Sequence, residues 1–127
     1  MFRRLDHLVI TTKDINRCAD FYRRLGFSVQ ERGGRYEALA GDFKINIHVL
    51  GHELEPKARN VGTGSTDFCI EIDAKMPHFI EFLTAQGIAI ELGPVQRHGA
   101  KGVMTSVYVR DTDGNLLEFA SYEEEIL

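Results

Sequence analysis

The stretch "LDHLVITTKDINRCADFYRRLGFSV", residues 5–29, predicts a strand, a helix, a glycine stop and a second strand. Asp14 is placed to cap the helix, apolar residues follow at helical spacing, and Gly26 supplies the left-handed end. The stretch "TDFCIEIDAKMPHFIEFLTAQGIAI", residues 66–90, repeats this order, with Pro77 in its first helical turn. A repeat of this kind predicts two units of the same architecture.

Three shorter strand candidates follow the glycine in each half of the chain. They are residues 27–31, 35–40 and 44–50 in the first half, and residues 88–92, 103–109 and 115–121 in the second. The sequence therefore predicts an α+β fold of two βαβββ modules, residues 1–51 and 66–127, which form a cup-shaped mixed sheet in a single domain. The charged, glycine-rich residues 52–65 are predicted to link them.

Composition narrows the class of partner. The chain has 127 residues, 43% of them hydrophobic, which suits one compact domain. Its formal net charge is -4, whereas nucleic-acid-binding proteins typically carry an excess of basic residues, so we expect a small-molecule partner. The sequence shows no membrane span and no signal peptide, which favours the cytoplasm. Its two cysteines are expected to be reduced and structural.

Four polar residues fall on corresponding strands of the repeat. His7 and His48 lie on the first and last predicted strands of the first half, and Asp67 and Glu118 on those of the second. Their apolar neighbours alternate with them, so the polar side chains are expected on the face away from the helices. Two imidazoles and two carboxylates suit a divalent ion such as Zn, Ni, Mn or Fe. The pattern predicts a metal site.

Each of the four has a simpler explanation when taken alone. A strand histidine is often a hydrogen-bonded packing residue, Asp67 could cap a loop, and Glu118 could be solvated on an exposed face. The coincidence of four such residues on equivalent strands favours the metal site. The remaining histidines, His52, His78 and His98, are expected at the surface or in loops, and Cys69 is expected to line the same face.

The stretches "LDHLVITTKDINRCADFYRRLGF", "INIHV" and "VYVRDTDGNLLEFASY" resemble the vicinal oxygen chelate superfamily, which includes glyoxalase I, fosfomycin-resistance enzymes, extradiol dioxygenases and bleomycin-binding proteins. The resemblance covers nearly the whole chain. The stretches "HVLGHELEPKA" and "RHGAKG" are similar to those of small glyoxalase-domain-containing proteins.

This resemblance implies paired modules around a metal, commonly in a homodimer, with the four ligands at positions that match His7, His48, Asp67 and Glu118. Glyoxalase I typically has a carboxylate at the position of His48 and a histidine at that of Asp67, so the ligand types here are exchanged. Total ligand charge is preserved. Thr112 also replaces the proline usual in its turn. The implied chemistry is proton abstraction next to metal-polarised oxygens, with Glu118 as the first candidate base and Asp67 the second.

Arg97 and Lys101, in the loop predicted from "QRHGAKG", are candidates to bind an anionic part of the substrate, and an ordinary solvated loop explains them equally well. Three functions remain open. They are a metal-dependent lyase or isomerase of glyoxalase type acting on a small vicinal-oxygen substrate, such as a lactoylglutathione-type thiol conjugate; a non-haem iron dioxygenase using His7, His48 and Glu118; and a metal-free drug- or metabolite-binding protein.

Overall fold

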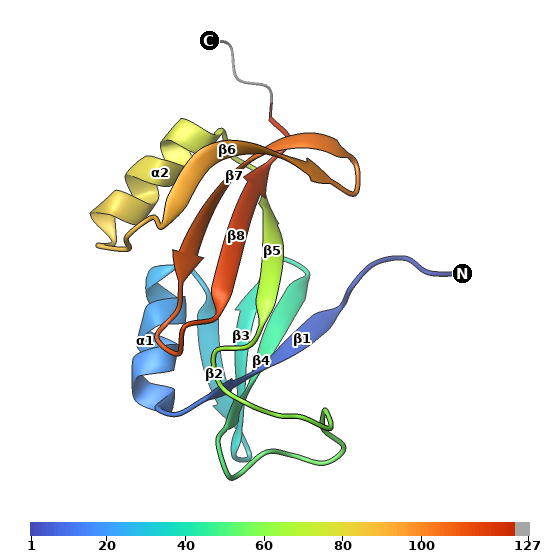
Figure 1. The fold of residues 1–127 in the computed structure, drawn as a ribbon. Coiled ribbons are helices and arrows are strands. Elements are labelled where there is room, and N and C mark those ends of the chain that lie inside the picture. The colour runs from blue at the N-terminus through green and yellow to red at the C-terminus, as the bar shows by residue number, and fades with distance from the viewer. Residues whose placement is uncertain (124–127) are drawn as a thin grey trace. The chain divides into compact units, whose positions relative to one another are not determined.

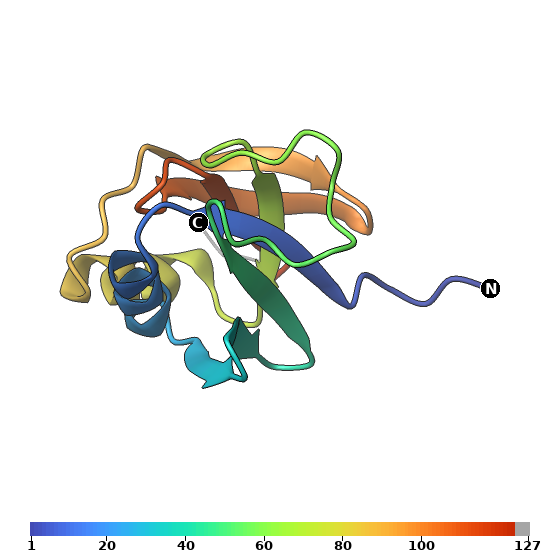
Figure 2. The same ribbon diagram turned by 90° about the horizontal axis from the view of Figure 1, so that it is seen from below.

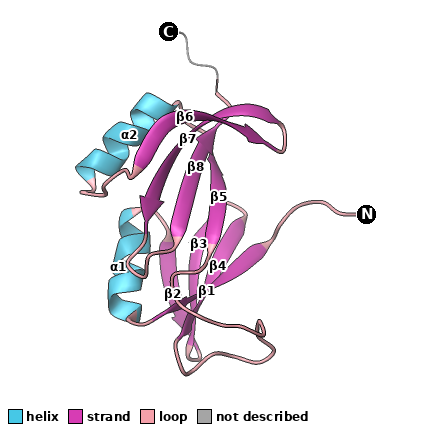
Figure 3. Ribbon diagram, in the orientation of Figure 1, coloured by secondary structure: helices cyan, strands magenta, loops and turns pink. Residues whose placement is uncertain are grey.

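The computed structural model describes residues 1–123, in which the order βαβββ occurs twice (Figure 1). The first set is β1 (His7–Thr12), α1 (Ile15–Arg24), β2 (Ser28–Arg32), β3 (Arg35–Ala40) and β4 (Phe43–Val49). The second is β5 (Asp67–Ile72), α2 (Met76–Ala85), β6 (Leu92–Gly99), β7 (Gly102–Arg110) and β8 (Leu116–Ser121). The predicted α+β class and repeat are confirmed, with two separate four-stranded mixed sheets (Figure 3).

The chain divides into two compact units. Among the described residues, unit 1 holds residues 1–66 and 112–114, and unit 2 holds residues 67–111 and 115–123. Residues 1–6 run away from β1 as an extended segment with exposed side chains (Figures 1 and 2). Neither helix within residues 1–123 is long and apolar enough to cross a membrane.

The sheet of unit 1 has the order β1-β4-β3-β2, with β1 parallel to β4 and the other pairs antiparallel. Its apolar face is buried through Ile10, Ala38, Ile45 and Ile47, as the alternation of the strands predicts. The opposite face carries the polar residues of the same strands. Burial of one face fixes which side chains remain available for chemistry.

Helix α1 begins where the sequence predicts. The Asp14 carboxylate accepts hydrogen bonds from the backbone N–H groups of Asn16 and Arg17, at 3.1 and 3.2 Å. The helix buries Tyr22, whose ring meets Phe27 edge to face with 5.5 Å between ring centroids. Gly26 follows with a φ of 104°, a conformation that glycine adopts without strain.

Unit 2 repeats this topology, with the order β5-β8-β7-β6 and β5 parallel to β8. Helix α2 buries Met76 and Leu83, and Phe79 packs against Phe119 of β8 with ring centroids 4.9 Å apart. The burial of Phe119 and of its neighbour Leu117 places Glu118 on the opposite face of β8.

The strand predicted over residues 88–92 is wrong, because β6 begins only at Leu92. The backbone N–H of Ile88 donates to the carbonyl of Leu83, and its side chain is buried, so this apolar residue closes the end of α2. The loop predicted around Arg97 and His98 is also wrong. Both residues lie on β6, paired with β7 through a hairpin at Gly99 to Gly102.

The turn "DTDGN" between β7 and β8 forms the turn that its composition predicts. The Asp111 carboxylate accepts from the backbone N–H and the side-chain amide of Asn115, at 2.9 and 2.8 Å. Asp113 accepts from the Thr12 hydroxyl at 2.6 Å and from the backbone N–H of Lys13 at 3.0 Å. These last contacts explain why residues 112–114 belong to unit 1.

Candidate metal centre

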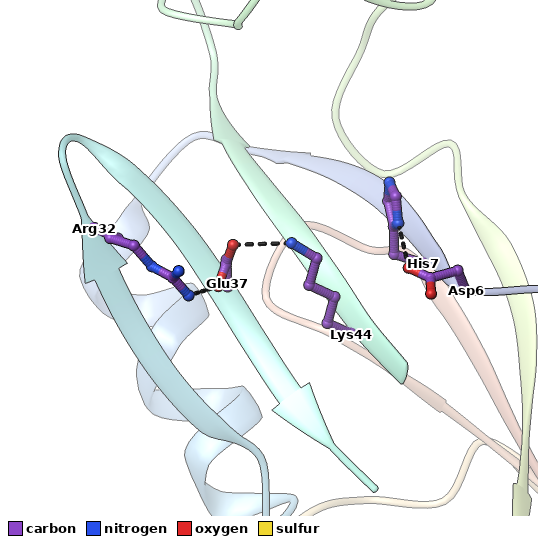
Figure 4. Close-up of polar contacts among 5 residues, drawn as sticks. All are labelled: Asp6, His7, Arg32, Glu37 and Lys44. Atoms are coloured by element: carbon purple, nitrogen blue, oxygen red, sulfur yellow. Dashed lines mark hydrogen bonds and ion pairs between the residues drawn. The ribbon is translucent and has the colours of Figure 1, made fainter. Parts of the chain in front are cut away.

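His7 begins β1 on the polar face of unit 1, with 45% of its side chain exposed. Its Nδ1 lies 2.8 Å from a carboxylate oxygen of Asp6 (Figure 4). A carboxylate on one ring nitrogen of a histidine fixes the ring and its tautomer, and leaves Nε2 as the nitrogen that a metal would take. The same contact lowers the pKa of Asp6, so its carboxylate stays charged beside the imidazole.

The register of β1 and β4 does not bring His7 and His48 together. His7 is level with Lys44, while His48 is level with Thr11, four residues farther along β1. At about 3.3 Å per residue, this offset separates the two histidines by roughly 13 Å along the strands. Both share one face, as predicted from sequence, but side chains that stand perpendicular to a sheet do not meet across that distance.

Lys44 is level with His7, and its ammonium group forms an ion pair with the carboxylate of Glu37. Lys44 Nζ lies 2.8 Å from Glu37 Oε1 on β3, and Arg32 lies 2.9 Å from the other oxygen. The hydrogen bond from Lys44 is the main cause that lowers the pKa of Glu37, and Arg32 adds to it. Figure 4 shows the Lys44 side chain directed to Glu37 and away from His7. The ammonium therefore does not crowd the imidazole.

In unit 2, Asp67 and Glu118 share the polar face. Asp67 begins β5, Cys69 follows two residues later on the same side, and Cys69 is level with Glu118 on β8. The carboxylates are thus offset by only two residues on neighbouring strands. Side chains at such diagonal positions lie within reach of one another across a sheet. The structure brings these two predicted ligands into one neighbourhood.

Cys69 stays a thiol in this setting. Desolvation by the surrounding sheet, and then the charges of Glu118 and Glu71, raise its pKa to about 12, although the side chain is open to solvent. Its position between Asp67 and the level of Glu118 places Cys69 on the same face of the sheet as the two carboxylates.

Comparison of the two registers identifies a residue that the sequence reasoning missed. Glu118 is level with the residue two positions after Asp67. In unit 1, the residue two positions after His7 is Val9, and the β4 residue level with Val9 is Asn46. Asn46, and not His48, is therefore the structural equivalent of Glu118. Alternation in the sequence places Asn46 and His48 on the same face, and only strand pairing distinguishes their levels.

The donor set fits a divalent metal in part. His7 has a carboxylate to orient it, and Asp67 and Glu118 supply oxygen donors from neighbouring strands. His48 does not fit beside His7, whereas Asn46 would offer a neutral amide oxygen. Within residues 1–123, no three His, Cys, Asp or Glu side chains gather closely enough to hold an ion. Each unit carries two of the four predicted ligands.

Arg97 and Lys101 differ in the partners of their charged groups. Arg97 Nε donates to the Tyr108 hydroxyl at 2.9 Å, with its guanidinium over the ring, and Tyr108 is level with Glu118. Lys101 lies in the hairpin turn and pairs with Glu71 at 2.8 Å. The Arg97 guanidinium retains donors for an anionic group. His52, His78 and His98 are exposed, in agreement with their predicted surface positions.

A chain that repeats βαβββ and presents paired polar residues on its sheets has the architecture implied by the sequence resemblance. A sequence model of the Glyoxalase/Bleomycin resistance protein/Dioxygenase superfamily matches residues 4–119. The chain belongs to this superfamily.

Two relatives cover most of the chain. The glyoxalase domain-containing protein RDO1 of Mycosarcoma maydis is 46% identical over 123 residues, which make up 96% of this chain and 70% of that protein. Virulence protein STM3117 of Salmonella typhimurium is 41% identical over 121 residues, 94% of this chain and 84% of that one. Its crystal structure matches with a TM-score of 0.92 over 97% of this chain and 99% of that chain.

A more distant structure shares the fold alone. Lactoylglutathione lyase from Agrobacterium tumefaciens matches with a TM-score of 0.70 at 20% identity, over 94% of this chain and 93% of that chain.

Proposed function

We propose that this protein is a metal-dependent lyase or isomerase of glyoxalase type that acts on a small vicinal-oxygen substrate, such as a lactoylglutathione-type thiol conjugate. The observation that carries the proposal is the pair Asp67 and Glu118, on one face of neighbouring strands and offset by two residues. Two carboxylates so placed supply oxygen donors and a base in the same neighbourhood. Superfamily membership supports the reaction class.

The metal would be held by His7, Asp67 and Glu118, with a fourth donor from β4. When bound, it would polarise oxygen atoms of the substrate and make a neighbouring carbon-bound proton more acidic. His7 belongs to unit 1, whereas Asp67 and Glu118 belong to unit 2, and we also propose that the protein is a homodimer.

The sequence predicts His48 as the fourth donor, whereas the β1–β4 register favours Asn46. An amide in that place would leave two carboxylates as the charged ligands, which still balance a divalent ion. The iron dioxygenase alternative needs His7 and His48 on one metal, and the β1–β4 register separates them by four residues. We therefore favour the lyase or isomerase.

Each candidate side chain has a role in the proposed reaction. Glu118 would take the proton from the substrate carbon and return it, with Asp67 as the second candidate base. Arg97, held against Tyr108, would bind an anionic part of the substrate, because its bonds to Tyr108 and to the Gln96 carbonyl do not involve its second terminal nitrogen. Lys101 is the weaker candidate, since Glu71 already neutralises its charge.

The experiment is elemental analysis of the untagged protein. We expect about one Ni, Zn, Mn or Fe per chain in the wild type and much less in His7→Ala and Glu118→Ala. His78→Ala, an exposed histidine on α2, is the matched control and should keep the metal. Failure of the wild type to hold metal after reconstitution would contradict the proposal and favour metal-free ligand binding.

Activity is tested separately by incubating the metal-loaded protein with vicinal-oxygen compounds in deuterated water. The proposed reaction moves a carbon-bound proton, so NMR should show deuterium at that carbon in the presence of protein. Glu118→Gln should abolish the exchange. Exchange at the wild-type rate in this variant would exclude Glu118 as the base.

A further inference from the structure

Ser106 on β7 makes one direct contact with the candidate site. Its hydroxyl donates to Glu118 Oε2 at 2.6 Å. Ser106 is fully buried, whereas Glu118 is half-buried. The β7–β8 register sets Ser106 level with Ala120 and Tyr108 level with Glu118, so the serine lies one step along the same face of the sheet. The hydroxyl and the carboxylate are therefore neighbours on one face of the sheet.

The chemistry of this contact gives Glu118 a fixed orientation. A carboxylate accepts hydrogen bonds and cannot donate them, so the proton of the bond belongs to the serine. A distance of 2.6 Å is typical of a charge-assisted O–H···O⁻ bond, which is about twice as strong as a neutral one. Holding a glutamate side chain in one position costs substantial rotamer entropy, and a strong hydrogen bond can offset this cost. The buried serine therefore holds Oε2 of Glu118, and Oε1 remains available for another partner.

We propose that Ser106 is a positioning residue for Glu118, which fixes Oε2 and presents Oε1 to the metal or to the substrate proton. This inference rests on the proposed function, because it assumes that Glu118 is a ligand or a base. In unit 1 the residue that corresponds to Glu118 is Asn46, and the β3 residue level with it, Glu37, corresponds to Tyr108 and is bound by Lys44 and Arg32.

The test measures the affinity for Mn²⁺ alone, by titration of the metal-free protein with EPR detection of the unbound ion. We expect Ser106→Ala to bind Mn²⁺ about 10- to 100-fold more weakly, the usual effect of losing a residue that orients a metal ligand. Ser106→Thr keeps the hydroxyl and should stay within about threefold of the wild type. Thr105→Ala, on the opposite face of the same strand, is the control and should bind like the wild type.

The outcomes separate the two proposals. Wild-type affinity in Ser106→Ala would overturn the positioning role and leave the metal site standing. Equal weakening in Ser106→Ala and Ser106→Thr, at unchanged thermal midpoints, would also overturn it, because the hydroxyl would then make no difference. Absence of Mn²⁺ binding by the wild type would overturn the proposed function itself, and the inference with it.

Discussion

Asn46 on β4 and Glu118 on β8 are equivalent residues of the two repeats, each level with the position two residues after the start of the first strand. One is a neutral amide and the other a carboxylate. The repeat therefore conserves the level of a candidate ligand and changes its charge. His48, two residues beyond Asn46, is level with Thr11 instead.

This equivalence predicts which β4 residue affects metal binding. We expect Asn46→Ala to lower Mn²⁺ affinity about tenfold or more, and Asn46→Asp to raise it, because an added negative charge attracts the ion. His48→Ala should change the affinity less than about threefold. Titration with EPR detection measures all three. A larger loss in His48→Ala than in Asn46→Ala would restore the ligand first predicted.

The contact between Asp6 and His7 predicts that Asp6 affects metal binding through the imidazole that we propose as a ligand. The Asp6 carboxylate orients the imidazole of His7 and raises its basicity, and Asp6→Asn removes that charge. We therefore expect about tenfold weaker metal binding with an unchanged number of sites. The matched control is Asp42→Asn, another exposed aspartate of unit 1, which pairs with Arg4. Equal affinities for Asp6→Asn and the wild type would show that His7 needs no such partner.

The lowered pKa of Glu37 predicts that this residue stabilises the protein less at acidic pH than at neutral pH. Its pKa in the folded protein lies below the ordinary value of 4.5, chiefly because Lys44 donates to it. A carboxylate with a lowered pKa stabilises the fold above its unfolded pKa, and the contribution is lost as the pH falls through the folded value. The wild type should therefore exceed Glu37→Gln in urea midpoint at pH 7, with a smaller difference near pH 3.

The control for this series is Glu31→Gln, an exposed glutamate on β2. Its urea midpoint should follow the wild type at both pH values. A constant difference between wild type and Glu37→Gln across the pH range would mean that packing, and not charge, explains the effect of Glu37.

The backbone around Gly93, at the start of β6, leaves no room for a side chain. A Cβ at this position would lie 2.6 Å from the backbone oxygen of Ser106 and 3.0 Å from Val107 Cα, and the φ of 117° is one that L side chains rarely adopt. We expect Gly93→Ala to destabilise the protein by about 1–3 kcal/mol, the usual cost of overpacking. Gly62→Ala is the comparison, because a Cβ there meets nothing within 4 Å. Thermal unfolding of both variants would decide, and equal midpoints would contradict the prediction.

Much of the fold follows from local pattern. The cap at Asp14 and the strand Arg35–Ala40 are where the sequence predicts them, because capping and alternation are short-range signals. The start of β6 is not where the sequence predicts it. Ile88 is of a residue type common in strands, but it packs at the end of α2. A bulge between Leu92 and Val95 further interrupts the pattern of that strand.

The candidate site shows the same division. Alternation with period two predicts that Asn46 and His48 share a face, and burial of Ile45 and Ile47 agrees. The level of each residue against β1 depends on which strands pair and in what register, which no single strand records. The sequence therefore predicts the face of the sheet on which a ligand lies, and the structure selects the residue.

The contacts of Asp113 also limit how the protein can be divided. A fragment ending at Thr66 would contain every strand of the first sheet and helix α1, yet it would lack the carboxylate that accepts from Thr12 and Lys13. The first repeat is therefore not self-sufficient within residues 1–66, because the acceptor at the end of its first strand comes from the turn before β8.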